Sequence, residues 1–288
     1  KETYEFILGD LNKAIELLAN TKKTRSDKRY VSLDVAYGIR ARVHLTMHNY
    51  ADALKDAEAA LASTSSVPYS SAAVSKPTFI DIEDASWMWG ILITDKDRVS
   101  TTGICNFPSH MGSLNYGYAS VGGWRRISPK LYNQIPESDV RKGWFLDDTG
   151  VSVNLPAAAQ AYITKKGAPV YTQVKYGPMN DEWGSNNNAT DVILMRVEEM
   201  YLIKAEAQAM NNDVSGGVNT LNSFVNTYRD PSYKCTATTG EAVQEAVWHQ
   251  RRIEFWGEGL AYFDIMRLNK GVNRLGCGFP KTAVFNIA

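Results

Sequence analysis

One helical hairpin pattern occurs twice in this chain of 288 residues, and the repeat limits the possible folds more than any other feature. Residues 34–48 and 50–63 have the apolar spacing of two helices joined by a short turn. The pattern returns 164 residues later along both helices. The paired positions are Tyr37 and Tyr201, Ile39 and Ile203, Ala41 and Ala205, Leu54 and Val218, Ala57 and Leu221, and Leu61 and Val225. Two copies of a helical hairpin predict a mostly α-helical frame.

Two further segments are predicted to be helical. Residues 4–19 repeat apolar side chains at the spacing of an amphipathic helix. Residues 191–210 are apolar around most of a helical circumference, with Arg196, Glu199 and Glu206 confined to one arc. A helix of that kind is buried on several sides, so we expect its carboxylates to pair with arginines from another segment.

Charge and glycine are concentrated near the C-terminus, at residues 247–271. A helix capped by Thr238 or Thr239 is predicted to end at Gly257 and Gly259, and a second helix is predicted over residues 260–268. The charged side chains at this corner are Arg251, Arg252, Glu254, Glu258, Asp264 and Arg267. Such a cluster forms either ion pairs that hold two helices together or an acid/base or anion-binding site, and we favour the structural ion pairs.

These residues also carry a resemblance to a known family. The runs RRIEF, WGEG and FDIMR, together with LYNQIP, DVRKGWF and YLIKAEA, resemble the SusD/RagB-like family of nutrient-capture lipoproteins from gut and oral Bacteroidetes. The run RARVHLTMHNYADALKDAEAAL resembles a tetratricopeptide hairpin. Two positions depart from the family pattern, because Gln250 stands where an acidic residue is usual and Ala261 where an arginine is usual.

The resemblance implies a mostly α fold, with a tetratricopeptide-like helical-repeat scaffold and a large irregular, partly β insertion. It implies a surface-exposed protein of the cell outer membrane that captures an oligosaccharide or polysaccharide and delivers it to a SusC-like TonB-dependent transporter. Membrane association in the family is by an N-terminal lipid anchor, which is not present in this sequence. The alternative function is a peptide-binding or protein–protein scaffold of tetratricopeptide type.

The middle of the chain differs in composition from both ends. Proline, glycine, serine and aromatic residues replace helical periodicity, with a strand-like alternation at 170–176 and a loop-like, exposed stretch at 179–190. We therefore expect helical hairpins over 1–66, a loop-rich insertion over 67–189, and a helical repeat with the charged corner over 190–288, all packed as one domain. Irregular segments on rigid scaffolds commonly carry binding surfaces.

The aromatic residues of the insertion are the candidates for glycan binding. An aromatic face can lie against the C–H face of a sugar ring. The candidates are Trp124, Tyr116, Tyr118, Arg125, Trp87 and Trp89. Trp124 follows two glycines, which suggests an exposed position, whereas Trp87 and Trp89 alternate like strand residues that face the same way, and core packing is favoured for these two.

Composition excludes several classes of function. Lys plus Arg and Asp plus Glu both number 31, so the zero net charge argues against nucleic-acid binding and favours an uncharged sugar. No catalytic or cofactor motif is present, so we expect no enzyme activity and no cofactor. Asp147 and Asp148 are expected to start a loop rather than to act in hydrolysis.

No metal site is predicted. His44 and His48 are four residues apart but lack a third ligand. Cys105, Cys235 and Cys277 are odd in number and far apart, so one disulfide with a free thiol and three free thiols are both compatible with the sequence.

Overall fold

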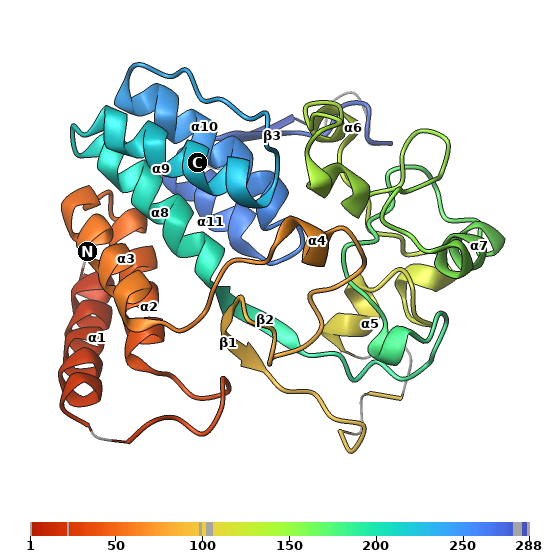
Figure 1. Cartoon of the computed structure of the whole chain (residues 1–288), viewed down its shortest axis with the longest axis horizontal. Helices are drawn as coiled ribbons and strands as arrows, with labels where there is room; N and C mark the ends of the chain where they lie inside the picture. The colour runs from red at the N-terminus through yellow and green to blue at the C-terminus, as the bar shows by residue number, and fades with distance from the viewer. Residues whose placement is uncertain (1, 22, 98–99, 102–105, 279–283, 287–288) are drawn as a thin grey trace.

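The computed structural model describes residues 2–21, 23–97, 100–101, 106–278 and 284–286. The longer helices occupy one side of the molecule, and the irregular middle segment with its short helices occupies the other (Figure 1). The fold is mostly α-helical, as the sequence predicts.

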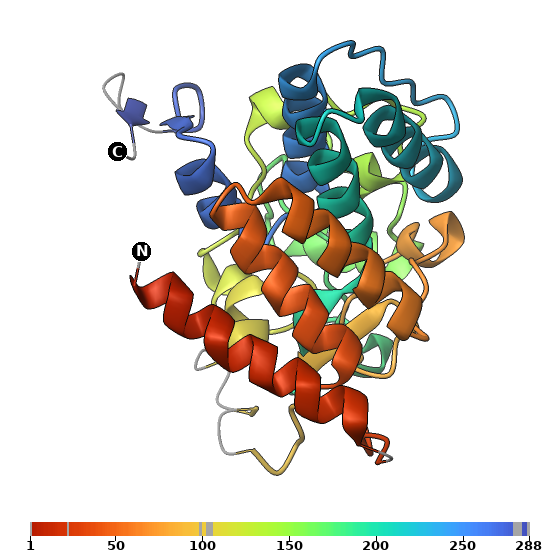
Figure 2. The same cartoon turned by 90° about the vertical axis from the view of Figure 1, so that its left-hand side faces the viewer.

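The repeated hairpins form the centre of the helical side. They consist of α2 (Leu33–Thr46) with α3 (Tyr50–Ser63), and α8 (Val197–Met210) with α9 (Val214–Tyr228). Adding 164 to the bounds of α2 gives those of α8, so the predicted repeat is confirmed. α3 packs against α8, and α1 (Glu2–Asn20) packs against α2 on the outside of the frame (Figure 2).

The helix predicted over residues 191–210 is wrong at its start. Residues Val192–Arg196 form strand β2, which pairs antiparallel with β1 (Trp87–Ile91), and α8 begins only at Val197. The β-branched residues Val192 and Ile193 favour an extended backbone, and pairing with β1 satisfies its polar groups. This pairing brings the first part of the insertion next to the residues that follow its C-terminal end.

Apart from β1, the described part of the insertion contains only short helices. They are α4 (Ser71–Val74), α5 (Phe107–Met111), η1 (Ala119–Val121), α6 (Pro129–Tyr132), η2 (Val140–Trp144), α7 (Ala157–Lys165) and η3 (Met179–Asp181). The strand predicted over 170–176 is wrong, because Thr172, Gln173 and Tyr176 make isolated bridges to three different segments. No two of these bridges extend into one ladder.

The 179–190 loop is exposed only in part. Asn186 is exposed, but Asn188 is fully buried and donates from Nδ2 to the carbonyl of Tyr116 at 3.1 Å. The C-terminal end of this loop is therefore part of the core of the insertion.

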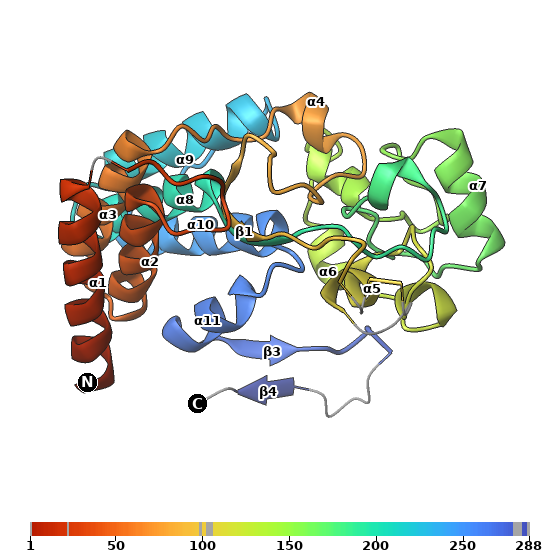
Figure 3. The same ribbon diagram turned by 90° about the horizontal axis from the view of Figure 1, so that it is seen from below.

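The C-terminal helices meet at the predicted glycine corner. α10 (Gly240–Glu254) is capped by Thr239, whose side chain accepts a hydrogen bond from Ala242 N, and α11 (Leu260–Arg267) follows. Gly257 and Gly259 have φ values of 80° and 83°, a region that glycine adopts without strain. A short hairpin of β3 (Gly271–Asn273) and β4 (Val284–Asn286) lies beyond α11 (Figure 3).

The hydrophobic cores join the three segments of the chain. One cluster contains side chains from α2, α3, β1 and α8, and a second lies between α8, α9 and α10. Two more lie within the insertion, one of which includes Ile253 of α10. The exact boundaries at 66 and 189 stay a prediction. None of the described helices combines the length and the apolar character that a bilayer span requires.

Candidate functional site

The charged corner is built around the carboxylate of Glu254. Arg196 Nη1 lies 2.7 Å from Oε1, Arg229 Nε lies 2.8 Å from Oε2, and Arg141 Nη1 lies 3.1 Å from Oε2. All four side chains have at most 1% exposure. Burial alone would raise the pKa of Glu254, but the guanidinium groups of Arg229 and Arg196 hold it well below its usual range.

A second set of ion pairs fixes α11. Asp264 accepts from Arg251 Nε at 2.7 Å and from Arg267 Nε at 2.9 Å. Arg267 also binds Glu206 of α8, and Arg251 Nη2 lies 3.8 Å from Glu199. The expected pairing between the α8 carboxylates and the C-terminal arginines is present. These groups are buried, so the cluster has the geometry of helix-to-helix ion pairs and not of a solvent-accessible site.

Arg252 was predicted to belong to this cluster, and its placement there is wrong. Its guanidinium carbon lies 4.8 Å from the centre of the Trp248 ring, and Lys270 Nζ lies 4.9 Å from the same ring. Arg251 faces α11 and α8, whereas Arg252 is the next residue of the helix and points in another direction.

The role of Lys175 was not predicted from the sequence. Its ammonium group is fully buried, donates to Glu258 Oε1 at 2.6 Å, and lies 4.5 Å and 4.7 Å from the ring centres of Phe79 and Trp144. Burial lowers the pKa of Lys175 to about 8, although the negative charge of Glu258 acts to raise it. Arg141 and Arg229 were missed as well, since they come from distant segments; the family run DVRKGWF was the available signal for Arg141.

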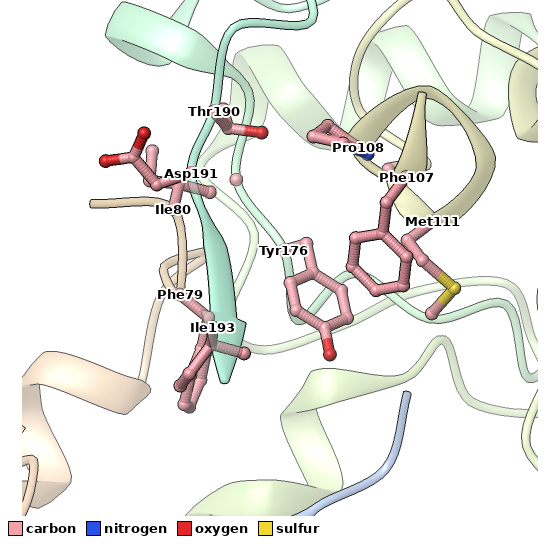
Figure 4. Close-up of a pocket in the computed structure, with 11 residues that line it drawn as sticks. Phe79, Ile80, Phe107, Pro108, Met111, Tyr176, Thr190, Asp191 and Ile193 are labelled. Carbon is pink, nitrogen blue, oxygen red and sulfur yellow. The ribbon is translucent and has the colours of Figure 1, made fainter. Parts of the chain in front are cut away.

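One pocket lies between α5 and β2 (Figure 4). Apolar side chains line it, with Thr190 and Asp191 at one side. Both carboxylate oxygens of Asp191 already accept backbone N–H groups, from Ile82 and Ile93 at 2.8 Å. The space left between the side chains holds little more than a water molecule, so the pocket is too small for a sugar ring.

Exposed aromatic side chains lie next to α5. Tyr116 and Tyr118 are each 43% exposed. Their rings are therefore accessible, as a role in glycan binding requires. The ring of His110, on α5, stacks on Tyr118 with centres 5.1 Å apart, and Arg125 lies over the same Tyr118 ring at 5.5 Å. Among the described residues, no ring or cation stacks on Tyr116. We call Tyr116, Tyr118, His110 and Arg125 the aromatic surface.

The three tryptophan candidates have different positions. Trp124 is half-buried and packs against the cluster that contains Leu114 and Ile163. Trp87 is fully buried and donates from Nε1 to the Tyr69 hydroxyl, so a contact between Trp87 and a ligand is excluded in this structure. Trp89 is half-buried and packs in a different cluster. The shared face predicted for Trp87 and Trp89 is wrong, because the β1–β2 register is irregular between them.

The histidine and aspartate pairs have structural roles. α2 ends at Thr46, so His48 lies in a turn with φ 60°, where Nε2 donates to the Arg267 carbonyl at 2.7 Å. His44 Nε2 lies 3.7 Å from Asp56. Asp147 accepts hydrogen bonds from the backbone of Thr149 and Val151, which is the expected loop start.

The described residues contain no group of three or more His, Cys, Asp or Glu side chains placed to hold a metal ion. Cys235 is a buried free thiol and Cys277 a half-buried one, whereas Cys105 lies outside the described residues.

Known structures share this fold. A SusD-like carbohydrate binding protein from Bacteroides vulgatus is 24% identical with a TM-score of 0.74, and the match covers 94% of this chain and 52% of that chain. A SusD superfamily protein from Bacteroides thetaiotaomicron is 19% identical with a TM-score of 0.73, over 97% of this chain and 58% of that one. Surface glycan-binding protein A from the same species is 18% identical with a TM-score of 0.66, over 93% and 61%.

This chain therefore spans little more than half the length of the structures it matches. No curated protein matches it. The model of the SusD family matches residues 129–278, slightly more than half of the sequence, from α6 to the turn after β3. This matched range includes Glu254, its arginine partners and the glycine corner, and on this basis the chain belongs to the SusD family.

Proposed function

We propose that this chain is part of a surface-exposed protein of the outer membrane that captures oligosaccharides and delivers them to a SusC-like TonB-dependent transporter. Membership of the SusD family is the observation that carries the proposal. Two of the structural neighbours are described as a carbohydrate binding protein and a surface glycan-binding protein, which is consistent with the same role here.

The aromatic surface is the proposed contact for the glycan. Tyr116 offers a ring that is 43% exposed, and sugar rings present apolar C–H faces that pack on such rings. The pocket between α5 and β2 and a second pocket, between Arg42 and Glu258, are both too small for a sugar, so the ligand is expected on the surface, in a shallow contact. A shallow contact favours long ligands, because each additional sugar unit can add contact area.

Binding without turnover is part of the proposal. Glu254 and Lys175, whose pKa values are both lowered, are buried in ion pairs and cannot reach a substrate. Delivery of the ligand intact to a transporter requires no chemical step in the binding protein.

A protein or peptide ligand is the second candidate, and one observation favours it. α11 exposes three large apolar side chains, since Tyr262 is 57%, Phe263 60% and Met266 43% exposed. Exposed apolar clusters are typical of protein contacts. This surface is compatible with a contact to the transporter and also with capture of a peptide.

A glycan array screened beside a peptide library tests the proposal. We expect retention of one class of oligosaccharide and no retention of peptides. The candidates from the array are then measured by calorimetry as a series of increasing length, and affinity should rise with length. Retention of peptides alone would reject glycan capture in favour of the second candidate.

A further inference from the structure

Arg125 of the aromatic surface and the next residue of the chain, Arg126, lack a carboxylate partner among the described residues. Arg125 Nη1 donates to the Gly123 carbonyl at 2.8 Å, and Arg126 Nε donates to the Val170 carbonyl at 2.9 Å. Arg126 is exposed and Arg125 is half-buried. Each guanidinium group has five N–H donors, so most donors of both remain available.

This situation differs from that of the arginines that build the fold. Arg40, Arg42, Arg141, Arg196, Arg229, Arg251 and Arg267 each have a carboxylate within 4.0 Å. Arg125 and Arg126 have no carboxylate at such a distance among the described residues, so their positive charges are not neutralised by an ion pair. Although the whole chain has zero net charge, Arg125 therefore places a local positive charge beside the exposed ring of Tyr118.

Arg125 is held in place by the ring of Tyr118. The guanidinium lies 5.5 Å from the ring centre, and His110 stacks on the same ring. Gly123 makes this arrangement possible, because a Cβ atom at that position would lie 2.5 Å from two carbon atoms of the Tyr118 ring. A guanidinium that is already positioned loses less conformational freedom when it binds an anion.

We infer that the ligand of this surface is an anionic glycan, in which a carboxylate or sulfate on a sugar residue is attracted by the positive charge of Arg125 and Arg126 while a sugar ring of the same glycan packs on Tyr116. Planar guanidinium groups bind both anions through paired N–H···O bonds. The inference rests on the proposed glycan capture and names the class of its ligand. An anionic ligand differs from the uncharged sugar that is predicted from the zero net charge of the chain.

Matched ligand pairs test the role of charge. Oligogalacturonate is compared with its methyl ester, and a sulfated galactan oligosaccharide with its unsulfated form, all of equal length. We expect at least one acidic member to bind about tenfold or more tightly than its neutral counterpart, the factor that a charge-assisted hydrogen bond supplies. The advantage should decrease as salt concentration rises.

Two variants locate the effect. Arg125→Gln with Arg126→Gln should remove the preference for the acidic ligand over its neutral form. The control is Asp181→Asn with Glu182→Gln, which changes two exposed acidic side chains of the 179–190 loop. The control should retain the preference. Thermal unfolding of both variants confirms that the comparison concerns folded protein.

The outcomes separate this inference from the proposed function. Binding of neutral oligosaccharides with equal affinity for their acidic counterparts would overturn the inference and leave glycan capture intact. Binding of no oligosaccharide would reject both. A preference for acidic ligands that survives in the double arginine variant would also overturn the inference, because the anion would then bind elsewhere.

Discussion

Arg267 of α11 binds Glu206 of α8 with both terminal nitrogens, and the Nη2–Oε2 distance is 2.7 Å. Both side chains have at most 1% exposure. Replacing one member of a buried ion pair leaves an unpaired charge, so Arg267→Met should lower the free energy of unfolding by about 3 to 5 kcal/mol. Urea unfolding measures this change. Arg252→Gln is the control, since Arg252 lies on Trp248, and an equal loss there would contradict the distinction between the two arginines.

Two glycines in helices should respond oppositely to alanine. A Cβ on Gly217 of α9 would lie 2.6 Å from the Ala205 carbonyl oxygen and 2.8 Å from Ala209 Cβ, so Gly217→Ala should destabilise the fold by about 1 to 3 kcal/mol. Gly9 of α1 has no atom within 4 Å of that position, and Gly9→Ala should stabilise by up to about 1 kcal/mol. Thermal melts of the two variants should shift in opposite directions. Equal shifts would mean that α8 and α9 are less closely packed in solution.

Stability should decrease in acid through His249. Burial, together with the charges of Arg252 and Arg141, lowers the pKa of His249 to about 4. Between pH 6.5 and pH 4 the unfolded chain binds a proton that the folded chain does not, so stability falls as pH falls, by up to about 3 kcal/mol. His249→Gln should reduce this decrease in urea unfolding measured across that range. Parallel pH profiles for the wild type and the variant would show that His249 remains accessible to protons.

Glycan affinity should depend on the exposed tyrosines. The double variant Tyr116→Ala with Tyr118→Ala should weaken oligosaccharide binding at least about tenfold, because it removes the ring face and the support of Arg125. Its melting temperature should change little, since both rings are exposed. Trp124→Ala should reduce binding and stability together, because Trp124 packs on a core cluster. Calorimetry on the full-length protein measures the affinities, and unchanged values in all variants would place the ligand on another surface.

Purified protein should release no reducing ends from polysaccharide above a boiled control. The expectation follows from the burial of Glu254 and Lys175, whose pKa values are perturbed by ion pairs inside the fold. Release that disappears when one carboxylate is replaced would instead identify a hydrolase.

Local patterns predicted the helical part of the fold well. The spacing of alanines, the cap at Thr239 and the glycines at 257 and 259 act over a few residues, and each element that they indicate is present. The error at 191–210 has a different origin. Residues Val192–Arg196 become a strand because β1, about a hundred residues earlier, supplies the partner, and a local pattern contains no information about such a partner.

The candidate site was predictable only in part. The exposure of Tyr116 and Tyr118 agrees with their glycine-rich surroundings. The burial of Trp87 and the contact between Arg125 and Tyr118 depend on tertiary packing. The same holds for the three arginines around Glu254, which come from the insertion, β2 and the end of α9.

The contact between α3 and α8 joins parts of the chain that are separated by the whole insertion. Closing so long a loop makes folding slow, since nonlocal contacts form only after the ends have met. The entropic cost, however, grows with the logarithm of loop length, and doubling the insertion would add only about 0.6 kcal/mol. Such a frame can accept longer, shorter or unrelated middle segments with little loss of stability, so new binding surfaces can evolve on the same four helices.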